Sequence, residues 1–184
     1  MLRDYQLEGI DWLVNNQYGI LADDMGLGKT VQTLAWLQLE RCDEDQKKLP
    51  ALIICPTSLV ENWAEEVKKF TPDQSVLILQ GSDRHKDWNS IQNSNIVITS
   101  YALMRRDIDK HLNFTYSVAI LDEAQQIKNR TTQNALAAKK IKANHRLVLS
   151  GTPIENSVTD LWSIMDFLMP GYLGNHKTFH EKYE

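Results

Sequence analysis

Residues 23–30 combine glycines, a lysine and a threonine in an order that can bind the phosphates of a nucleotide. The run reads Asp23-Asp24-Met25-Gly26-Leu27-Gly28-Lys29-Thr30 and follows an apolar stretch at residues 19–22. Glycines let backbone N–H groups turn toward a phosphate chain at the positive end of a helix, where Lys29 would neutralise phosphates and Thr30 would bind Mg²⁺. The usual GxxxxGK(S/T) pattern has glycine in place of Asp23, so an ordinary glycine-bearing turn stays open for the loop alone.

A second pair of reactive side chains, Asp122 and Glu123, follows the apolar stretch 118–121. Open α/β sheets bind ligands at the carboxyl ends of their strands, so this pair would enter such a crevice. Asp122 would hold Mg²⁺, and Glu123 would orient and deprotonate the attacking water. Two acidic residues at a strand end are also typical of a helix N-terminal charge effect. Their combination with a phosphate loop about ninety residues earlier favours a nucleoside triphosphatase.

Short apolar runs that alternate with helical stretches must position these groups. The runs are continuous rather than alternating, which is typical of strands covered on both faces of a parallel sheet. We expect strands at residues 19–22, 52–55, 76–79, 96–99, 118–121 and 147–149. The fold class is therefore α/β.

Two amphipathic helices have start signals in the sequence. Ser58 with Glu61 three residues later predicts a capping box before the apolar positions Leu59, Trp63 and Val67. A similar signal at Ser157 precedes a later helix, whose apolar positions are Leu161, Ile164, Met165 and Leu168. We expect solvated surface at residues 41–48 and 81–95.

Composition limits the classes of function. The chain has 184 residues, with 20 Lys and Arg against 24 Asp and Glu, a net charge of −4. This length predicts one domain, and the charge argues against a broadly positive nucleic-acid surface. The longest apolar run, residues 51–55, is far shorter than the roughly 20 residues of a membrane helix. We expect a cytosolic protein without a membrane partner, and reduced, structural cysteines at Cys42 and Cys55.

Taken in order, the motifs resemble those of the Swi/Snf-type ATPases, a branch of the superfamily-two helicase-like proteins that translocate on double-stranded DNA. The resemblance covers nearly the whole chain. One basis is the phosphate loop, whose Asp-x-Met-Gly-Leu-Gly-Lys-Thr form is typical of this branch. The other is a segment that looks like the family's adenine-reading motif: Leu2-Arg3-Asp4-Tyr5-Gln6, Gly9 and Trp12-Leu13. It implies that residues 1–184 form a three-layer RecA-like P-loop NTPase lobe, with a mostly parallel central sheet flanked by helices, and that ATP and Mg²⁺ are its cofactors.

The resemblance also implies roles in nucleotide binding and hydrolysis. Gln6 would bind the adenine edge, and the cofactor-binding loop would comprise Asp24, Met25, Gly26, Leu27, Gly28, Lys29 and Thr30. Thr30 and Asp122 would hold the metal. Lys29 and Glu123 would be catalytic together with Gln125, where many relatives carry His. Because an amide does not titrate, we expect coupling through Gln125 to be insensitive to pH.

Further segments resemble the DNA-contacting motifs of the family, in which small hydroxyl donors bind phosphates without reading sequence. The implied DNA-binding residues are Pro56, Thr57, Ser58, Asn62, Trp63, Thr99, Ser100, Tyr101, Lys128, Asn129, Thr152 and Pro153. The run Ser150, Gly151 and Thr152 resembles the third motif, which would couple the γ-phosphate to the DNA track.

Proteins of this kind work with two RecA-like lobes, and this chain ends soon after the third motif. The expected partners are therefore double-stranded DNA, a C-terminal lobe of the same protein and a DNA-bound protein complex, in the nucleoid or in the nucleus. An arginine finger is worth roughly 10³ to 10⁵ in turnover, so we expect the chain alone to hydrolyse ATP poorly. Two alternatives stay open: a strand-separating DNA or RNA helicase lobe, and a non-hydrolysing nucleotide-binding interaction module.

Other signals have plainer interpretations. His176 and His180 have the spacing of metal ligands on one helical face, but no third ligand is evident, so we expect solvated histidines. Trp36 and Trp162 lie in apolar helices and are predicted to be core. The sequence leaves Trp88 open between core and base stacking.

Overall fold

A computed structural model of the chain describes residues 2–40, 49–152 and 158–183. In these residues six strands form one sheet in the order β1-β6-β5-β2-β4-β3, and every neighbouring pair is parallel. The strands are β1 (Tyr18–Leu21), β2 (Ala51–Cys55), β3 (Val76–Leu79), β4 (Ile96–Ser100), β5 (Tyr116–Asp122) and β6 (Ala143–Leu149). All six predicted strands are confirmed, with β5 and β6 longer at their amino ends than the apolar runs.

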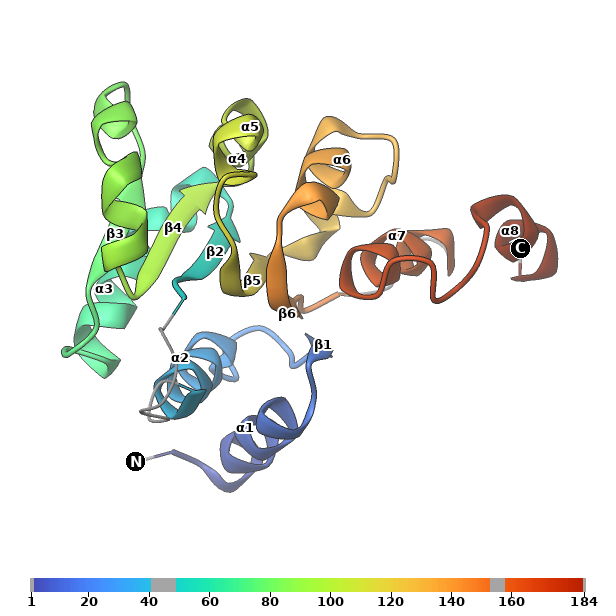
Figure 1. Ribbon diagram of the computed structural model, residues 1–184. Helices are drawn as coiled ribbons and strands as arrows, with labels where there is room; N and C mark the ends of the chain where they lie inside the picture. Colours follow the sequence, from blue (N-terminus) through green and yellow to red (C-terminus); the bar gives the residue numbers. More distant parts are fainter. Residues whose placement is uncertain (1, 41–48, 153–157, 184) are drawn as a thin grey trace.

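Helices cover both faces of the sheet and make three layers (Figure 1). One face packs against α1 (Asp4–Asn15), α2 (Lys29–Glu40) and α3 (Val60–Phe70), and the other against α4 (Tyr101–Arg106), α6 (Gln133–Lys140) and α7 (Val158–Leu168). Shorter elements are η1 (Thr57–Leu59), η2 (Asp83–Lys86), η3 (Trp88–Asn93), α5 (Ile108–His111) and η4 (Ala124–Ile127). The last helix, α8 (His176–Tyr183), packs on α7 at the end of the molecule away from β3.

The central strands are apolar at every position because both faces are covered. All five residues of β2 are buried, with Leu52 and Ile54 on the α4–α6–α7 face and Ile53 and Cys55 on the opposite face. Full burial of one such side chain contributes about 1.5 to 3 kcal/mol. Continuous runs of this kind therefore specify a parallel sheet that is buried on both sides.

The start of α3 differs from the predicted capping box. Residues 57–59 form the 3₁₀ turn η1, α3 begins at Val60, and no side chain caps it. A Ser58 cap would accept from the Val60 or Glu61 amide, and in the tight turn the Val60 amide donates to the Thr57 carbonyl instead. The capping prediction is wrong here. Helix α7 is confirmed, while Ser157 lies outside the described residues.

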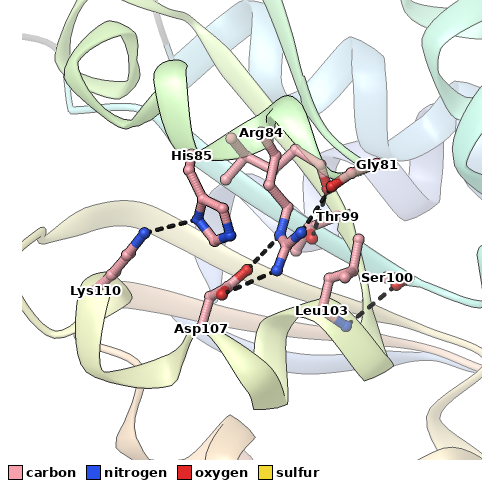
Figure 2. Close-up of polar contacts among 9 residues, drawn as sticks. Gly81, Arg84, His85, Thr99, Ser100, Leu103, Asp107 and Lys110 are labelled. Atoms are coloured by element: carbon pink, nitrogen blue, oxygen red, sulfur yellow. Dashed lines mark hydrogen bonds and ion pairs between the residues drawn. The ribbon is translucent and has the colours of Figure 1, made fainter.

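Residues 81–95 are mostly exposed, as expected, but Arg84, Trp88 and Ile91 anchor the segment in the core. Arg84 is 4% exposed and forms a two-pronged ion pair with Asp107, at 2.6 Å from Nε and 3.2 Å from Nη2. Its Nη1 also donates to the Gly81 carbonyl at 2.6 Å. Figure 2 shows this cluster, with the exposed contact between His85 and Lys110 beside it. Burial disfavours the Asp107 carboxylate, but the hydrogen bonds and charge of Arg84 outweigh it and lower the Asp107 pKa.

Beside the Arg84–Asp107 ion pair, aromatic side chains also hold this segment against the core. Trp88, 8% exposed, sets its ring edge-on to His111 with centroids 4.8 Å apart and stacks on Phe114. His111 is fully buried, and its Nδ1 lies 2.7 Å from the Tyr116 hydroxyl. Trp88 is therefore a core residue and not a base-stacking platform. Burial lowers the pKa of His111 from 6.5 to about 4.

Several smaller expectations also have outcomes. Trp36 and Trp162 are buried, as predicted, and Cys55 is a buried free thiol, while Cys42 lies outside the described residues. His176 is half-buried against Trp162 rather than solvated, with ring centroids 5.1 Å apart. No described group of His, Cys, Asp and Glu has the geometry of a metal site. No helix in the described ranges is long and apolar enough to cross a membrane.

The depressed pKa of His111 predicts acid sensitivity of folding. Because the unfolded chain binds a proton near pH 6.5 and the folded chain only near 4, the stabilising contribution is complete above 6.5. It is lost as pH falls toward 4, by about 3 kcal/mol in total. Urea unfolding of His111→Gln between pH 7 and 4 should show a flatter fall in stability than wild type. Equal slopes for wild type and His111→Gln would contradict this role of His111.

Candidate nucleotide-binding site

The ends of three adjacent strands are level with one another. In the sheet register Leu21 at the end of β1 and Asp122 at the end of β5 both pair with Leu149 at the end of β6. Neighbouring strands lie about 4.8 Å apart, so Leu21 and Asp122 are separated by roughly two strand spacings. The loop that follows β1 and the carboxylates that follow β5 therefore emerge at one edge of the sheet.

The phosphate loop spans the turn from β1 into α2. Gly26 and Gly28 both have φ of +85°, a left-handed conformation that glycine adopts without strain. Lys29 begins α2, and its ammonium donates to the carbonyls of Asp23 at 2.6 Å and Asp24 at 3.2 Å. Oxygen atoms thus already surround this cation, and phosphate oxygens could exchange for them.

Helix α1 contacts the same loop through the side chain predicted to read adenine. Gln6 Nε2 and the Tyr5 hydroxyl each donate to the Leu27 carbonyl at 3.2 Å. Gln6 Oε1 accepts from the Arg3 amide at 2.9 Å, which fixes the side chain on the first turn of α1. A Cβ at Gly28 would lie 2.5 Å from Gln6 Nε2, so only glycine allows this close approach. Gln6 is therefore beside the phosphate loop, and its contact with adenine stays a prediction.

Asp122 is held by donors from three directions. The Trp63 indole donates to Oδ2 at 2.8 Å, the Glu123 amide donates to Oδ1 at 2.9 Å, and the Tyr101 hydroxyl donates to the Asp122 carbonyl at 2.8 Å. Burial, followed by the charge of Glu123, raises the pKa of Asp122, whereas the Trp63 hydrogen bond and the charge of Lys29 act to lower it. The charge of Lys29 therefore acts directly on this carboxylate.

The donor set suits a magnesium ion. The charged form of Asp122 is disfavoured by burial and by Glu123, so a nearby cation would relieve both penalties. Each carboxylate oxygen accepts one hydrogen bond from the groups above and keeps a lone pair for a metal. Thr30 lies in the first turn of α2 and supplies a neutral hydroxyl oxygen, the hard ligand type that Mg²⁺ prefers.

Glu123 adopts an uncommon backbone conformation. Its φ of 53° and ψ of 58° are left-handed, and no other non-glycine residue in the described ranges has positive φ. Such a conformation costs about 1 to 2 kcal/mol and concentrates at functional sites. Gln125 Nε2 donates to Glu123 Oε2 at 2.7 Å, and Glu123 O accepts from the Gln126 amide. The catalytic carboxylate predicted from sequence is thus fixed by Gln125, which was predicted with it.

The third motif lies against the phosphate loop. The Ser150 amide donates to the Leu21 carbonyl at 3.3 Å, and the Thr152 amide donates to Ser150 Oγ at 3.2 Å. A Cβ at Gly151 would come within 3.3 Å of Met25 Cγ, so this segment packs directly on the loop. Through this contact a change at the phosphate loop could reach residues 150–152, which are predicted to couple the γ-phosphate to the DNA track.

Comparison with known proteins identifies the family of this site. The profile of the SNF2-related domain matches residues 5–184. The chain belongs to that family. A Sulfolobus solfataricus SWI2/SNF2 ATPase core in complex with dsDNA superposes with a TM-score of 0.90 and 40% identity, over 99% of this chain and 38% of that one. The three-layer RecA-like lobe expected from sequence is therefore confirmed.

Curated SNF2 relatives are much longer than this chain. The TATA-binding protein-associated factor mot1 of Aspergillus fumigatus is 40% identical over 99% of this chain, which covers 10% of the relative. The putative ATP-dependent helicase/translocase YwqA of Bacillus subtilis is 44% identical over 99% of this chain, which covers 20% of the relative. The chain thus spans a tenth to a fifth of these proteins.

Four residues that the SNF2 resemblance assigned to DNA contact are buried. The side chains of Trp63, Thr99, Ser100 and Tyr101 are at most 4% exposed. Thr99 donates to the Leu79 carbonyl, and Ser100 Oγ caps α4 by accepting from the Leu103 amide. The DNA contact of these four residues therefore stays a prediction. Trp63 and Tyr101 also support Asp122 by hydrogen bonds, a role that only the folded packing reveals.

The remaining predicted DNA contacts are accessible. Thr57, Ser58, Asn62, Asn129 and Thr152 are exposed. Pro56 and Lys128 are half-buried, and Pro153 lies outside the described residues. Residues 56–58 directly follow the carboxyl end of β2, so they emerge at the same edge of the sheet as the phosphate loop.

The hydrogen bond from Trp63 to Asp122 predicts a measurable stability difference. Trp63→Phe keeps an aromatic ring but leaves one carboxylate oxygen without its donor, which should cost about 2 kcal/mol at pH 8. Trp36→Phe is the matched control, because no described group accepts from its buried Nε1. Urea unfolding should therefore show a larger loss for Trp63→Phe than for Trp36→Phe. Equal losses of stability in the two variants would mean that the Trp63 indole stabilises the fold by packing alone.

Proposed function

We propose that this chain is the first, ATP-binding lobe of an ATP-dependent double-stranded DNA translocase of the chromatin-remodelling, Swi/Snf-like type. The observation that carries the proposal is the level ending of β1 and β5 on either side of β6, with the charge of Lys29 acting on Asp122. The similarity to a SWI2/SNF2 core in complex with dsDNA supports the choice of track.

The residues divide the chemistry of ATP hydrolysis among them. Lys29 and the backbone amides of the glycine loop bind the phosphates, and Gln6 binds the adenine edge. Thr30 and Asp122 hold Mg²⁺, which neutralises charge on the phosphates when bound. Glu123 orients the attacking water, and Gln125 fixes the Glu123 carboxylate through the 2.7 Å hydrogen bond.

The exposed side chains beside the site serve the DNA track. Thr57, Ser58 and Asn62 offer small hydroxyl and amide donors, Lys128 a positive charge, and Asn129 and Thr152 further polar groups. Such groups bind the phosphate backbone without reading base sequence, as translocation over any sequence requires. Because the net charge is −4, this lobe alone binds DNA weakly. A second lobe would therefore supply part of the DNA affinity.

The second lobe is the proposed partner within the same protein. This chain covers 38% of the Sulfolobus core, so the rest of a related protein has room for a second lobe that carries the arginine finger. A DNA-bound protein complex is a further partner, since one relative is named a TATA-binding protein-associated factor. The whole protein would then work where its DNA is, in the nucleoid or the nucleus.

Two other functions remain as competing outcomes. A strand-separating helicase would use the same residues, and one relative is named a putative ATP-dependent helicase/translocase. Duplex unwinding by the complete protein would favour the helicase. A non-hydrolysing interaction module is opposed by the ordered Glu123–Gln125 pair, and absence of any turnover in the complete protein would favour it.

The proposal predicts how turnover depends on the second lobe. This chain alone should hydrolyse ATP at least about 10³-fold more slowly than the two-lobed protein with duplex DNA, because the proposed second lobe would supply the arginine finger. Steady-state phosphate release measures both rates. Lys29→Ala should abolish DNA-stimulated turnover of the two-lobed protein. Turnover by this chain alone that matches the two-lobed protein would contradict the proposal.

The amide at position 125 predicts a flat pH response. Gln125→His would place a group that titrates near neutral pH against Glu123, so DNA-stimulated turnover of the two-lobed protein should become pH-dependent between about 6 and 7.5. The neighbouring, exposed Gln126→His is the matched control and should keep the wild-type profile. If Gln125→His also keeps that profile, position 125 does not set the pH response.

A further inference from the structure

The phosphate loop begins with a carboxylate where most such loops have glycine. Asp23 stands at that position, and an uncontrolled negative charge there would repel the phosphates that the loop must bind. Its Oδ2 accepts a 2.7 Å hydrogen bond from Gln32 Nε2, nine residues later on α2. Because Gln32 is fully buried, the oxygen that it holds faces the interior between the helices.

The close packing of α1 fixes the orientation of the Gln32 amide. A Cβ at Gly9 would lie 2.0 Å from Gln32 Oε1 and 3.2 Å from its Cδ, so the amide occupies the space that the missing side chain leaves. Oε1 is buried and has no hydrogen-bond partner among the described residues. Only the Nε2 end is bonded, to Asp23, which is an expensive arrangement for packing alone because a buried oxygen is left unsatisfied.

Asp23 also controls the catalytic lysine through its backbone. The Asp23 carbonyl accepts from Lys29 Nζ at 2.6 Å, while its side chain accepts from Gln32. The two hydrogen bonds meet at one residue, so the bond from Gln32 restrains the stretch of backbone whose carbonyl orients Lys29. One residue links the buried amide to the phosphate-binding cation.

We propose that Gln32 is a positioning residue of the nucleotide site, which holds the Asp23 carboxylate away from the phosphates and thereby fixes the start of the loop and Lys29. The proposal rests on the ATP-binding function given above. It predicts that the hydrogen bond, rather than the identity of either residue, is required for tight ATP binding.

The decisive test exchanges donor and acceptor. Gln32→Glu is nearly isosteric but sets two carboxylates against each other, so the Kd of this chain for ATP should rise at least about tenfold. The Kd for ADP should rise less, because ADP carries less charge. In the double variant Asp23→Asn with Gln32→Glu, the new asparagine amide can donate to the new glutamate, and ATP affinity should return to within about threefold of wild type. Calorimetric titration measures all of these affinities.

Each outcome decides between the site and the positioning role. Lys29→Ala should bind ATP more weakly than wild type, and equal affinities would overturn the ATP-binding function and the positioning proposal with it. A Lys29-dependent affinity that Gln32→Glu leaves unchanged would overturn the positioning role alone. Equal losses for ATP and ADP that the double variant does not restore would mark a packing defect, and would also overturn it.

Discussion

The parallel alignment of β1, β6 and β5 is the constraint on which the site depends. Strands that run in one direction deliver all their carboxyl ends to one edge, and the shared partner Leu149 sets the ends of β1 and β5 level. Helix α2 can then begin with Lys29 within electrostatic reach of Asp122. A slip in the register would separate the phosphate loop from Asp122, although every local motif would be intact.

This alignment places a buried charge, charge repulsion and backbone strain at the site, and hydrogen bonds from neighbouring groups offset their energetic cost. Asp122 is partly buried beside a second carboxylate, and Glu123 has a strained backbone. The indole of Trp63, the hydroxyl of Tyr101 and the amide of Gln125 each donate a hydrogen bond to this pair of residues. A bound cation and a nucleotide would relieve the remaining charge repulsion, so the SNF2 site is arranged to be most stable when loaded.

Local patterns predicted the strands and the phosphate loop because both are encoded in contiguous residues. The anchored segment 81–95 was missed because burial of Arg84 depends on Asp107, 23 residues later, and a short 3₁₀ helix has no long apolar period. Trp63 and Tyr101 were assigned to DNA by motif order, yet their polar atoms meet Asp122 across the sheet edge. Such tertiary hydrogen bonds leave no trace in spacing or composition.

The central claim is that Lys29 at the start of α2 and Asp122 at the end of β5, about ninety residues apart in the sequence, bind one ligand. A double-mutant cycle on Mg·ATP affinity, with Lys29→Ala, Asp122→Asn and the combination, tests this claim most directly. We predict that both single changes weaken binding and that the combination departs from additivity by more than about 0.5 kcal/mol, as expected for groups that share a ligand. Additive effects, or an Asp122→Asn variant that binds Mg·ATP as wild type does, would contradict the account.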